Sequence, residues 1–341
     1  MLSALTRLNM TADVRPKEMK RRILLSTTRI LFTVAIVVTV TGCLISQPSF
    51  RSNRLSSASV APDRLRSHVI MLSETFYPRD WENEANLNTC ADYIGDHFTK
   101  AGAVVQFQTV PAHGRQYRNV IARFGVGNGS KLVVGAHYDA CGDTPGADDN
   151  ASGVAALIEL SYLLGRTPPE REIELVAYVL EEPPFFRTPL MGSAVHAESI
   201  SAEKDEIVGV IVLEMVGYFN NTKGSQSYPS LLLKLIYPSR GNFIAVVGRW
   251  DQGRWVKNVK MGMKGATDLP VYSIRAPAFF PGIDFSDHIN YWPLGLDALM
   301  ITDTAFYRNR EYHTSGDTAD RLDYKRMSKV VIAVFEALKS I

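Results

Sequence analysis

The sequence GADDNASG at residues 146–153, which follows HYD at residues 137–139, decides the interpretation of this chain. A hydrophobic run at 132–136 precedes His137, and apolar residues recur with helical spacing after Gly153. The histidine is therefore expected where a buried strand ends, and the acidic stretch just before a helix. Because an open α/β sheet keeps its active site at the carboxyl ends of its strands, these polar residues are expected to face a functional site.

The length and composition favour one large globular domain. The chain has 341 residues, of which 46% are apolar, so it can bury a full core without a second domain. The net charge of +2 conceals an uneven distribution, since residues 1–30 hold seven bases against two acids and leave 30 bases against 33 acids elsewhere. This balance gives no support for binding to nucleic acid. Three cysteines form no disulfide framework.

The N-terminus predicts export and a membrane tether. Basic residues precede an apolar stretch at 23–40, which ends in VTGC at 40–43, and this pattern resembles a bacterial lipoprotein signal that leaves Cys43 lipidated. The alternative is an uncleaved anchor helix, although Arg29 interrupts the apolar run. Either form would hold the protein in the periplasm or cell envelope. Residues 1–43 are thus predicted as a signal or anchor, and residues 44–62 as a flexible linker.

Alternating strand and helix patterns over residues 63–341 predict an α/β fold with a doubly wound, mixed but mostly parallel sheet flanked by helices. We expect strands at 104–110, 119–124, 131–136, 172–180, 207–213 and 298–302. We expect helices at 63–77, 86–102, 151–165, 192–199 and 324–338. The segment 218–280, with helices expected near 241–264, is interpreted as a cap inserted over the site.

Acidic and imidazole groups follow several of these predicted strands. Glu181 and Glu182 follow the strand at 172–180, and Glu214 follows the strand at 207–213. His313 lies beyond the strand at 298–302. Any one such residue is more often a solvated loop residue than a ligand, but the strand ends meet at one edge of the sheet. Their grouping there with His137 and Asp149 predicts a site where cations neutralise the carboxylates.

The mixture of imidazoles and carboxylates favours zinc, because calcium and magnesium prefer oxygen ligands. Two ions per chain are needed to use all five groups. They would lie about 3.5–4 Å apart around a shared water and a shared carboxylate. We assign His137, Asp149 and Glu214 to one ion, and Asp149, Glu182 and His313 to the other.

Two further acids are candidates for catalytic roles. Glu181 adjoins a ligand without being needed as one, so it is the candidate general base that accepts the proton of the bridging water. A structural acid is the alternative. Asp139 could accept the N–H of the His137 imidazole and fix its tautomer, although it could also be a solvated turn residue. Asp148, beside Asp149, has weaker grounds and is left out of the site.

Five motifs together resemble the co-catalytic zinc exopeptidase family of secreted bacterial leucyl aminopeptidases, whose relatives include glutamate carboxypeptidase and the glutaminyl cyclases. They are HYD at 137–139, GADDNASG at 146–153, EE at 181–182, SDH at 286–288, and HT at 313–314 followed by DT at 317–318. The resemblance covers roughly 63–341 and implies the zinc exopeptidase, or phosphorylase/hydrolase-like, fold. It also implies that Asp149 is the bridging carboxylate, that Glu181 is the base, and that the four remaining ligands are His137, Glu182, Glu214 and His313.

The chain departs from this family in the loop at 183–187, which is longer and more aromatic than usual, and at two positions that concern the chemistry of the site. Glu214 lies where many members carry aspartate. Residues 283–285 lie where some members have a tyrosine that supports the oxyanion, so another donor, His288 or zinc itself, would have to stabilise the tetrahedral intermediate. His288 is therefore a candidate substrate-binding residue, with a buried structural histidine as the alternative.

The resemblance implies a zinc-dependent exopeptidase, and we expect an aminopeptidase that removes N-terminal residues from peptide substrates. Two alternatives remain: an acyltransferase similar to the glutaminyl cyclases, and a tethered, non-catalytic receptor or scaffold. The cyclases depart from the DDNASG pattern that this chain keeps at 148–153. Retention of all five ligands and of the base argues against the scaffold.

Overall fold

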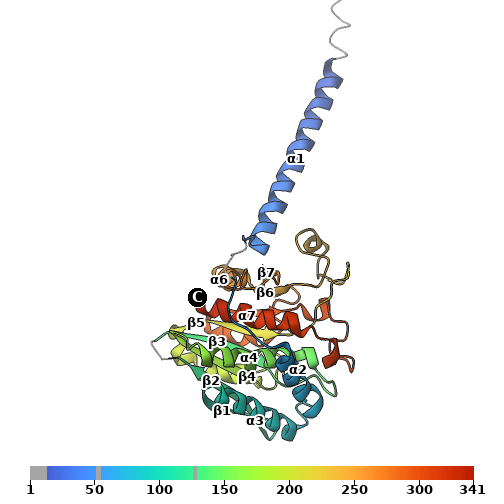
Figure 1. Cartoon of the computed structure of the whole chain (residues 1–341). Coiled ribbons are helices and arrows are strands. Elements are labelled where there is room, and N and C mark those ends of the chain that lie inside the picture. Colours follow the sequence, from blue (N-terminus) through green and yellow to red (C-terminus); the bar gives the residue numbers. More distant parts are fainter. Residues whose placement is uncertain (1–13, 51–54, 126–128) are drawn as a thin grey trace, which may run out of the picture. The chain divides into compact units, whose positions relative to one another are not determined.

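A computed structural model describes residues 14–50, 55–125 and 129–341 (Figure 1). The chain divides into two compact units, Met1–Gln47 and Pro48–Ile341. In the described part of the first unit, α1 spans Val14–Ser46. Its segment Met19–Ser46 is long and apolar enough to cross a membrane, by length and composition alone. An apolar N-terminal helix is consistent with a signal peptide or an anchor, and the predicted lipid on Cys43 stays a prediction.

The second unit is built on one eight-stranded sheet with the order β1-β2-β4-β3-β5-β8-β6-β7. Its strands are β1 Val104–Ala112, β2 Arg115–Phe124, β3 Lys131–His137, β4 Glu172–Tyr178, β5 Ile207–Glu214, β6 Ile244–Arg249, β7 Val271–Ala276 and β8 Ala298–Thr302. Four neighbouring pairs are parallel, namely β4/β3, β3/β5, β5/β8 and β6/β7, and three are antiparallel. The predicted mixed, mostly parallel sheet is confirmed.

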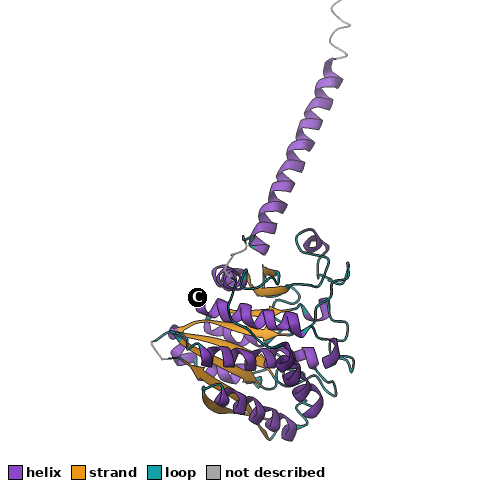
Figure 2. Ribbon diagram, in the orientation of Figure 1, coloured by secondary structure: helices purple, strands orange, loops and turns teal. Residues whose placement is uncertain are grey.

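Helices cover both faces of the sheet (Figure 2). The α-helices of this unit are α2 Pro62–Ile70, α3 Glu84–Lys100, α4 Gly153–Arg166, α5 Gly192–Ser199, α6 Gly253–Met263 and α7 Tyr324–Ser340. Successive side chains of a strand point to opposite faces of the sheet, so each strand contributes to the core on either face. Leu132 and Val134 of β3 pack in the core that also contains residues of α2, α3, α4, α6 and α7, whereas Val133 packs with Ala197 of α5 and with Tyr291. Tyr291 lies in the 3-10 helix η6, Asp287–Leu294.

The segment 218–280, which we expected to form a cap, differs from that expectation in its second half. Residues 244–276 supply β6, α6 and β7. β6 pairs antiparallel with β8, so this segment extends the sheet instead of lying over it. The apolar, partly β-branched run Ile244–Val247 favours a strand where we expected a helix. Residues 218–243 contain no strand; within them η4, a 3-10 helix, spans Leu231–Leu235.

The predicted linker at 44–62 is partly attached to the second unit. The Ser56 backbone N–H donates to Ala266 O at 2.9 Å, and its hydroxyl donates to Glu336 at 2.6 Å. Lys264 donates to the Ser49 hydroxyl at 3.2 Å. Residues 51–54 of the linker lie outside the described residues. Ser49 and Ser56 of the predicted linker therefore hydrogen bond to residues that follow α6 and to α7, whereas residues 44–46 belong to α1.

Candidate metal centre

Four strands of the sheet deliver the predicted site residues to one edge. His137 is the last residue of β3, Glu214 is the last residue of β5, and Glu181 and Glu182 follow β4 closely. Asp149 lies in the loop between β3 and α4, and His313 lies beyond β8. Except for His313, which is partly exposed, these residues are at most 7% exposed. The topology thus gathers six polar side chains in a buried position.

Asp149 lies between the two imidazoles. Its Oδ1 is 3.3 Å from His137 Nε2, and its Oδ2 is 3.0 Å from His313 Nε2. Glu214 Oε2 lies 3.4 Å from His137 Nε2, and Glu182 Oε2 lies 3.2 Å from His313 Nε2. The side chains therefore form two groups that share one carboxylate, with one oxygen of Asp149 facing each group.

Burial opposes the ionisation of this cluster. It raises the pKa of Glu181 well above its ordinary range, raises that of Glu182 to about 8, and raises that of Glu214. Burial lowers the pKa of His137, but the charges of Glu214 and Glu181 outweigh it, and the net shift is upward. Burial also raises the pKa of Asp149, but contacts with the two histidines outweigh it, and the net shift is downward. Four carboxylates packed together need positive charge.

The unpartnered atoms of the cluster fit a metal ion. Among the residues that the structure describes, none forms a hydrogen bond with His137 Nε2, His313 Nε2 or Glu182 Oε1, although all three atoms are buried. Buried polar atoms normally have partners. Imidazole nitrogens and carboxylate oxygens are ligands that zinc accepts. The donor set and its unsatisfied atoms therefore fit zinc.

The backbone around these side chains adopts conformations that L-residues rarely take. Positive φ angles occur at Leu180 (61°), just before Glu181, at Met215 (46°), just after Glu214, and at His313 itself (56°). Each costs of order 1–3 kcal/mol and persists only where surrounding contacts enforce it. Met215 shows such a contact, because its N–H donates to the Asn150 side chain at 3.0 Å. Rare backbone angles therefore lie at, or directly beside, three of the site residues.

Hydrogen bonds to Asp317 and Leu213, and a glycine at position 146, hold Asp149 in place. The Asp317 carboxylate accepts the backbone N–H groups of Asp148 and Asp149 at 3.0–3.1 Å. Asn150 donates to Leu213 O at the end of β5 at 2.8 Å. Gly146 has φ +56°, and a Cβ there would lie 2.3 Å from Asp149 O, so only glycine fits. These contacts fix the loop of Asp149 relative to the strand that carries Glu214.

Asp139 occupies a supporting position. It lies close to the imidazole that we expected it to orient, since His137 Nδ1 is 3.5 Å from its carboxylate and 3.2 Å from its backbone oxygen. The carboxylate also accepts the backbone N–H groups of Glu181, at 3.2 Å, and Glu182, at 3.0 Å. Asp139 therefore connects β3 to the acidic pair that follows β4.

Asp148 points away from the cluster. Its carboxylate accepts the Gly217 N–H and the Asn309 side-chain N–H, each at 3.0 Å. This environment agrees with leaving Asp148 out of the site. Ser286, by contrast, donates to Glu214 Oε2 at 2.7 Å and orients that side chain.

The structure does not bring His288 into contact with a substrate pocket. The side chain is fully buried, its Nε2 lies 2.8 Å from Ile283 O, and its ring lies edge-on to Trp292. Burial lowers its pKa to about 4. These contacts favour the buried structural histidine that we considered as the alternative.

Three residues near the site were not foreseen from the sequence. Arg79 is 1% exposed and donates to the backbone oxygens of Tyr138 and Gly146 at 3.0 and 2.9 Å, which fixes the loop between them. Tyr312 stacks on His313 with ring centroids 3.7 Å apart. Cys141 places its sulfur near Glu182 and His313. Only Tyr312 carried a sequence signal, its position beside a predicted ligand.

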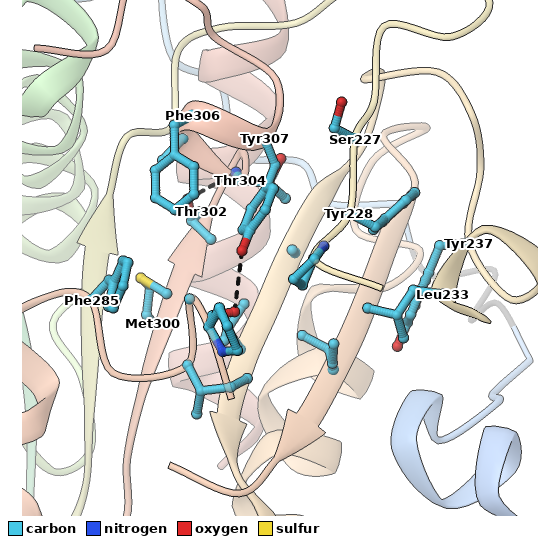
Figure 3. Close-up of a pocket in the computed structure, with 18 of the residues that line it drawn as sticks. Ser227, Tyr228, Leu233, Tyr237, Phe285, Met300, Thr302, Thr304, Phe306 and Tyr307 are labelled. Carbon is cyan, nitrogen blue, oxygen red and sulfur yellow. Dashed lines mark hydrogen bonds between the residues drawn. The ribbon is translucent and has the colours of Figure 1, made fainter. Parts of the chain in front are cut away.

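An apolar pocket adjoins the cluster, with Glu214 and Tyr312 among its lining residues. Figure 3 shows other residues of this lining, among them Tyr228, Tyr237 and Phe306. Aromatic side chains supply much of the lining. The hydroxyls of Tyr228 and Tyr237 donate to Pro238 O and Ser273 O, each at 2.6 Å, so these polar groups are already satisfied. Such a pocket suits an apolar group next to the metal centre.

Comparisons with known proteins identify the family of the chain. Residues 119–338 match the model of peptidase family M28. The uncharacterized protein YfbL of Escherichia coli is 45% identical over 315 residues, which cover 90% of this chain and 97% of YfbL. Aminopeptidase YwaD of Bacillus subtilis is 27% identical over 216 residues, which cover 61% of this chain and 41% of YwaD.

The fold is similar to that of solved structures as well. A Zn-dependent exopeptidase from Parabacteroides distasonis superposes with a TM-score of 0.62 at 19% identity, covering 84% of this chain and 100% of the other. The family match spans all the predicted site residues and confirms the resemblance drawn from the motifs, and with it the prediction that the protein is a peptidase. The chain belongs to peptidase family M28.

Proposed function

We propose that this chain is a zinc-dependent aminopeptidase with two zinc ions in its site. The observation that carries the proposal is the position of Asp149, with one oxygen toward His137 and the other toward His313. His137 and Glu214 would hold one ion, Glu182 and His313 the other, and Asp149 both. Membership of family M28 supports zinc as the metal, and the aminopeptidase relatives support the reaction.

The chain's own residues suit peptide hydrolysis. Zinc bound at this centre would supply a Lewis acid for the scissile carbonyl and acidify the attacking water. Glu181 would accept the proton of that water on a carboxylate oxygen and return it to the leaving amine nitrogen. Its Oε2 lies 3.9 Å from His137 Nε2, so the base borders the ligand cluster. Asp139 would keep both Glu181 and the His137 ring in position.

The apolar pocket supports a preference for a bulky apolar side chain at the residue that is removed. Its lining includes Phe285, Met300 and Phe306, and Glu214 is the one charged residue among the described residues that line it. An acidic substrate side chain would lose its hydration there without gaining a positively charged partner.

We also propose that the protein is exported and held at a membrane. The apolar helix near the N-terminus supports this localisation. Either a lipid on Cys43 or a retained helix would give this localisation.

Glu181→Gln should remove nearly all turnover and leave the metal bound. An amide cannot accept the proton, so kcat should fall by about 10²- to 10⁴-fold. The matched control is Glu198→Gln, which changes an exposed glutamate on α5 and should behave as wild type. Peptidase assays with elemental analysis of each variant test this, and substantial activity in Glu181→Gln would show that another group is the base.

Removal of zinc should destabilise the protein more at pH 8 than at pH 5. The folded-state pKa of Glu182, about 8, exceeds its ordinary value of 4.5, and that of Glu214 is also raised. In the zinc-free protein, protonation of these two carboxyl groups favours the folded state. This contribution to stability is fully present below about pH 4.5 and is lost as the pH rises toward 8. Bound zinc compensates for this loss because it favours the ionised carboxylates.

The measurement is the difference in Tm between the zinc-loaded and the chelator-treated protein at each pH. A difference that is equal at both values, or larger at pH 5, would contradict the assignment of these carboxylates as ligands.

Peptides and aminoacyl anilides with a free N-terminal leucine or phenylalanine should be the best substrates, because the pocket next to Glu214 is apolar. N-acetylated forms should resist cleavage. Glutaminyl peptides should release no ammonia, and ammonia without free amino acid would favour a cyclase instead.

The variant Ala245→Leu provides a control on the pocket. Ala245 lines the pocket from β6, so the larger side chain should lower kcat/KM for the phenylalanyl substrate by about tenfold or more. The alanyl substrate should be affected little. An equal loss for both substrates would indicate general damage, and no loss for either would mean that the substrate side chain binds elsewhere.

Cell fractionation of the full chain should place it with membranes. If Cys43 is lipidated, the mature protein begins at that residue, and Cys43→Ser should block both fatty-acid labelling and cleavage. If the helix is retained, the mass of Cys43→Ser should differ from that of the wild type only by the substitution itself, and the variant should stay in the membrane fraction. Recovery of the wild-type protein in the cytosol would contradict export.

A further inference from the structure

Cys141 lies beside the second metal position of the proposed centre. It follows β3 by four residues, its thiol is free, and the side chain is partly exposed. Its sulfur and one ligand atom each of Glu182 and His313 all lie within 4.8 Å of one another. These three residues come from separate segments of the chain, so their approach is a product of the fold.

The environment of this sulfur contains a buried atom that lacks a partner. Glu182 is 4% exposed, and no described residue forms a hydrogen bond with its Oε1. Its other oxygen, Oε2, faces His313 Nε2 at 3.2 Å, and that nitrogen has no hydrogen bond within the described part of the chain either. Buried atoms of Glu182 and His313 thus lack hydrogen bonds next to the sulfur of Cys141. This arrangement indicates one ligand that all three side chains bind.

The loop that carries Cys141 is held in place. The Thr144 hydroxyl donates to Cys141 O at 2.8 Å, and the Ala140 N–H donates to Arg79 O at 3.1 Å. Arg79 itself is buried and donates to Pro145 O and Gly146 O at 2.8 and 2.9 Å. These hydrogen bonds therefore fix the loop that carries Cys141.

We propose that the Cys141 thiolate is a ligand of the metal ion that Glu182, His313 and Asp149 hold. The inference rests on the proposed dizinc site and adds a fourth protein ligand at one of its two positions. On binding, the thiol gives up its proton to solvent, as metal-bound cysteines do. A thiolate is a softer ligand than a carboxylate and suits zinc well. The position with Cys141 would therefore keep its ion more tightly than the His137–Glu214 position.

The other two cysteines provide internal controls. Cys90 is fully buried in α3, and burial raises its pKa to about 12. It does not belong to any of the ligand groups found among the described residues. Cys43 belongs to the other unit of the chain. A sulfur signal from the metal centre can therefore be assigned by substituting one cysteine at a time.

The test replaces zinc by Co²⁺ in the full chain, purified in detergent and stripped with a chelator. Thiolate ligation should give a sulfur-to-cobalt charge-transfer band in the near ultraviolet. We expect this band in the wild type and in Cys90→Ser, and its complete loss in Cys141→Ser. A cobalt-loaded wild type without the band, or a band that persists in Cys141→Ser, would overturn the proposal.

Alkylation provides a second measurement that needs no variant. Iodoacetamide should modify Cys141 of the stripped wild type, and zinc should largely suppress this reaction, as measured by peptide mass spectrometry, because a thiolate bound to metal is not free to attack. Equal rates with and without zinc would overturn the proposal. If two ions bind but the sulfur stays reactive, only the role of Cys141 fails. If no metal binds at all, the proposed function fails instead.

Discussion

The confinement of four carboxylates at one sheet edge is the constraint on which the site depends. Asp149, Glu181, Glu182 and Glu214 are each more than nine-tenths buried, where like charges repel strongly and water cannot screen them. Two imidazoles relieve part of this repulsion, and Asp149 contacts both. The hydrogen bonds of Asn150 and Asp317 act in the opposite sense, since they hold the segment that carries Asp149 close to the strand that carries Glu214. Such an arrangement is unfavourable by itself and becomes favourable when it binds cations.

Much of this arrangement could be predicted from the sequence, because it follows from local patterns. Long apolar runs identified β3, β4, β5 and β8, and the polar residue after each run showed where the strand ended. Parallel strands bring their carboxyl ends to one edge, so the positions of His137, Glu182 and Glu214 after such runs were enough to group them. The helix α4 was equally clear, because its apolar residues recur with a period of 3.6 and a glycine-rich turn precedes it.

Other features could not be predicted, because they depend on contacts between distant segments. β6 was expected as part of a helix, since a short apolar run does not reveal whether it pairs with a sheet. Arg79 lies 67 positions before Gly146, to which it donates, and nothing in its surrounding sequence indicates that role. The approach of Cys141 to Glu182 and His313 likewise joins three separate loops. His288 was ambiguous for a related reason, as a histidine in a motif carries no sign of its burial.

The two sides of the centre differ in ways that bear on how a substrate would bind. Glu214, on the His137 side, borders the apolar pocket, whereas Cys141 lies on the Glu182–His313 side. Catalytic zinc sites keep a coordination position open, and structural sites fill all four positions with protein ligands. A thiolate at the second position would fill it with protein groups and leave the first position as the more open one. The substrate side chain would then lie in the pocket next to the position that still has room for the carbonyl oxygen and the attacking water, and the other position would mainly hold the shared carboxylate in place.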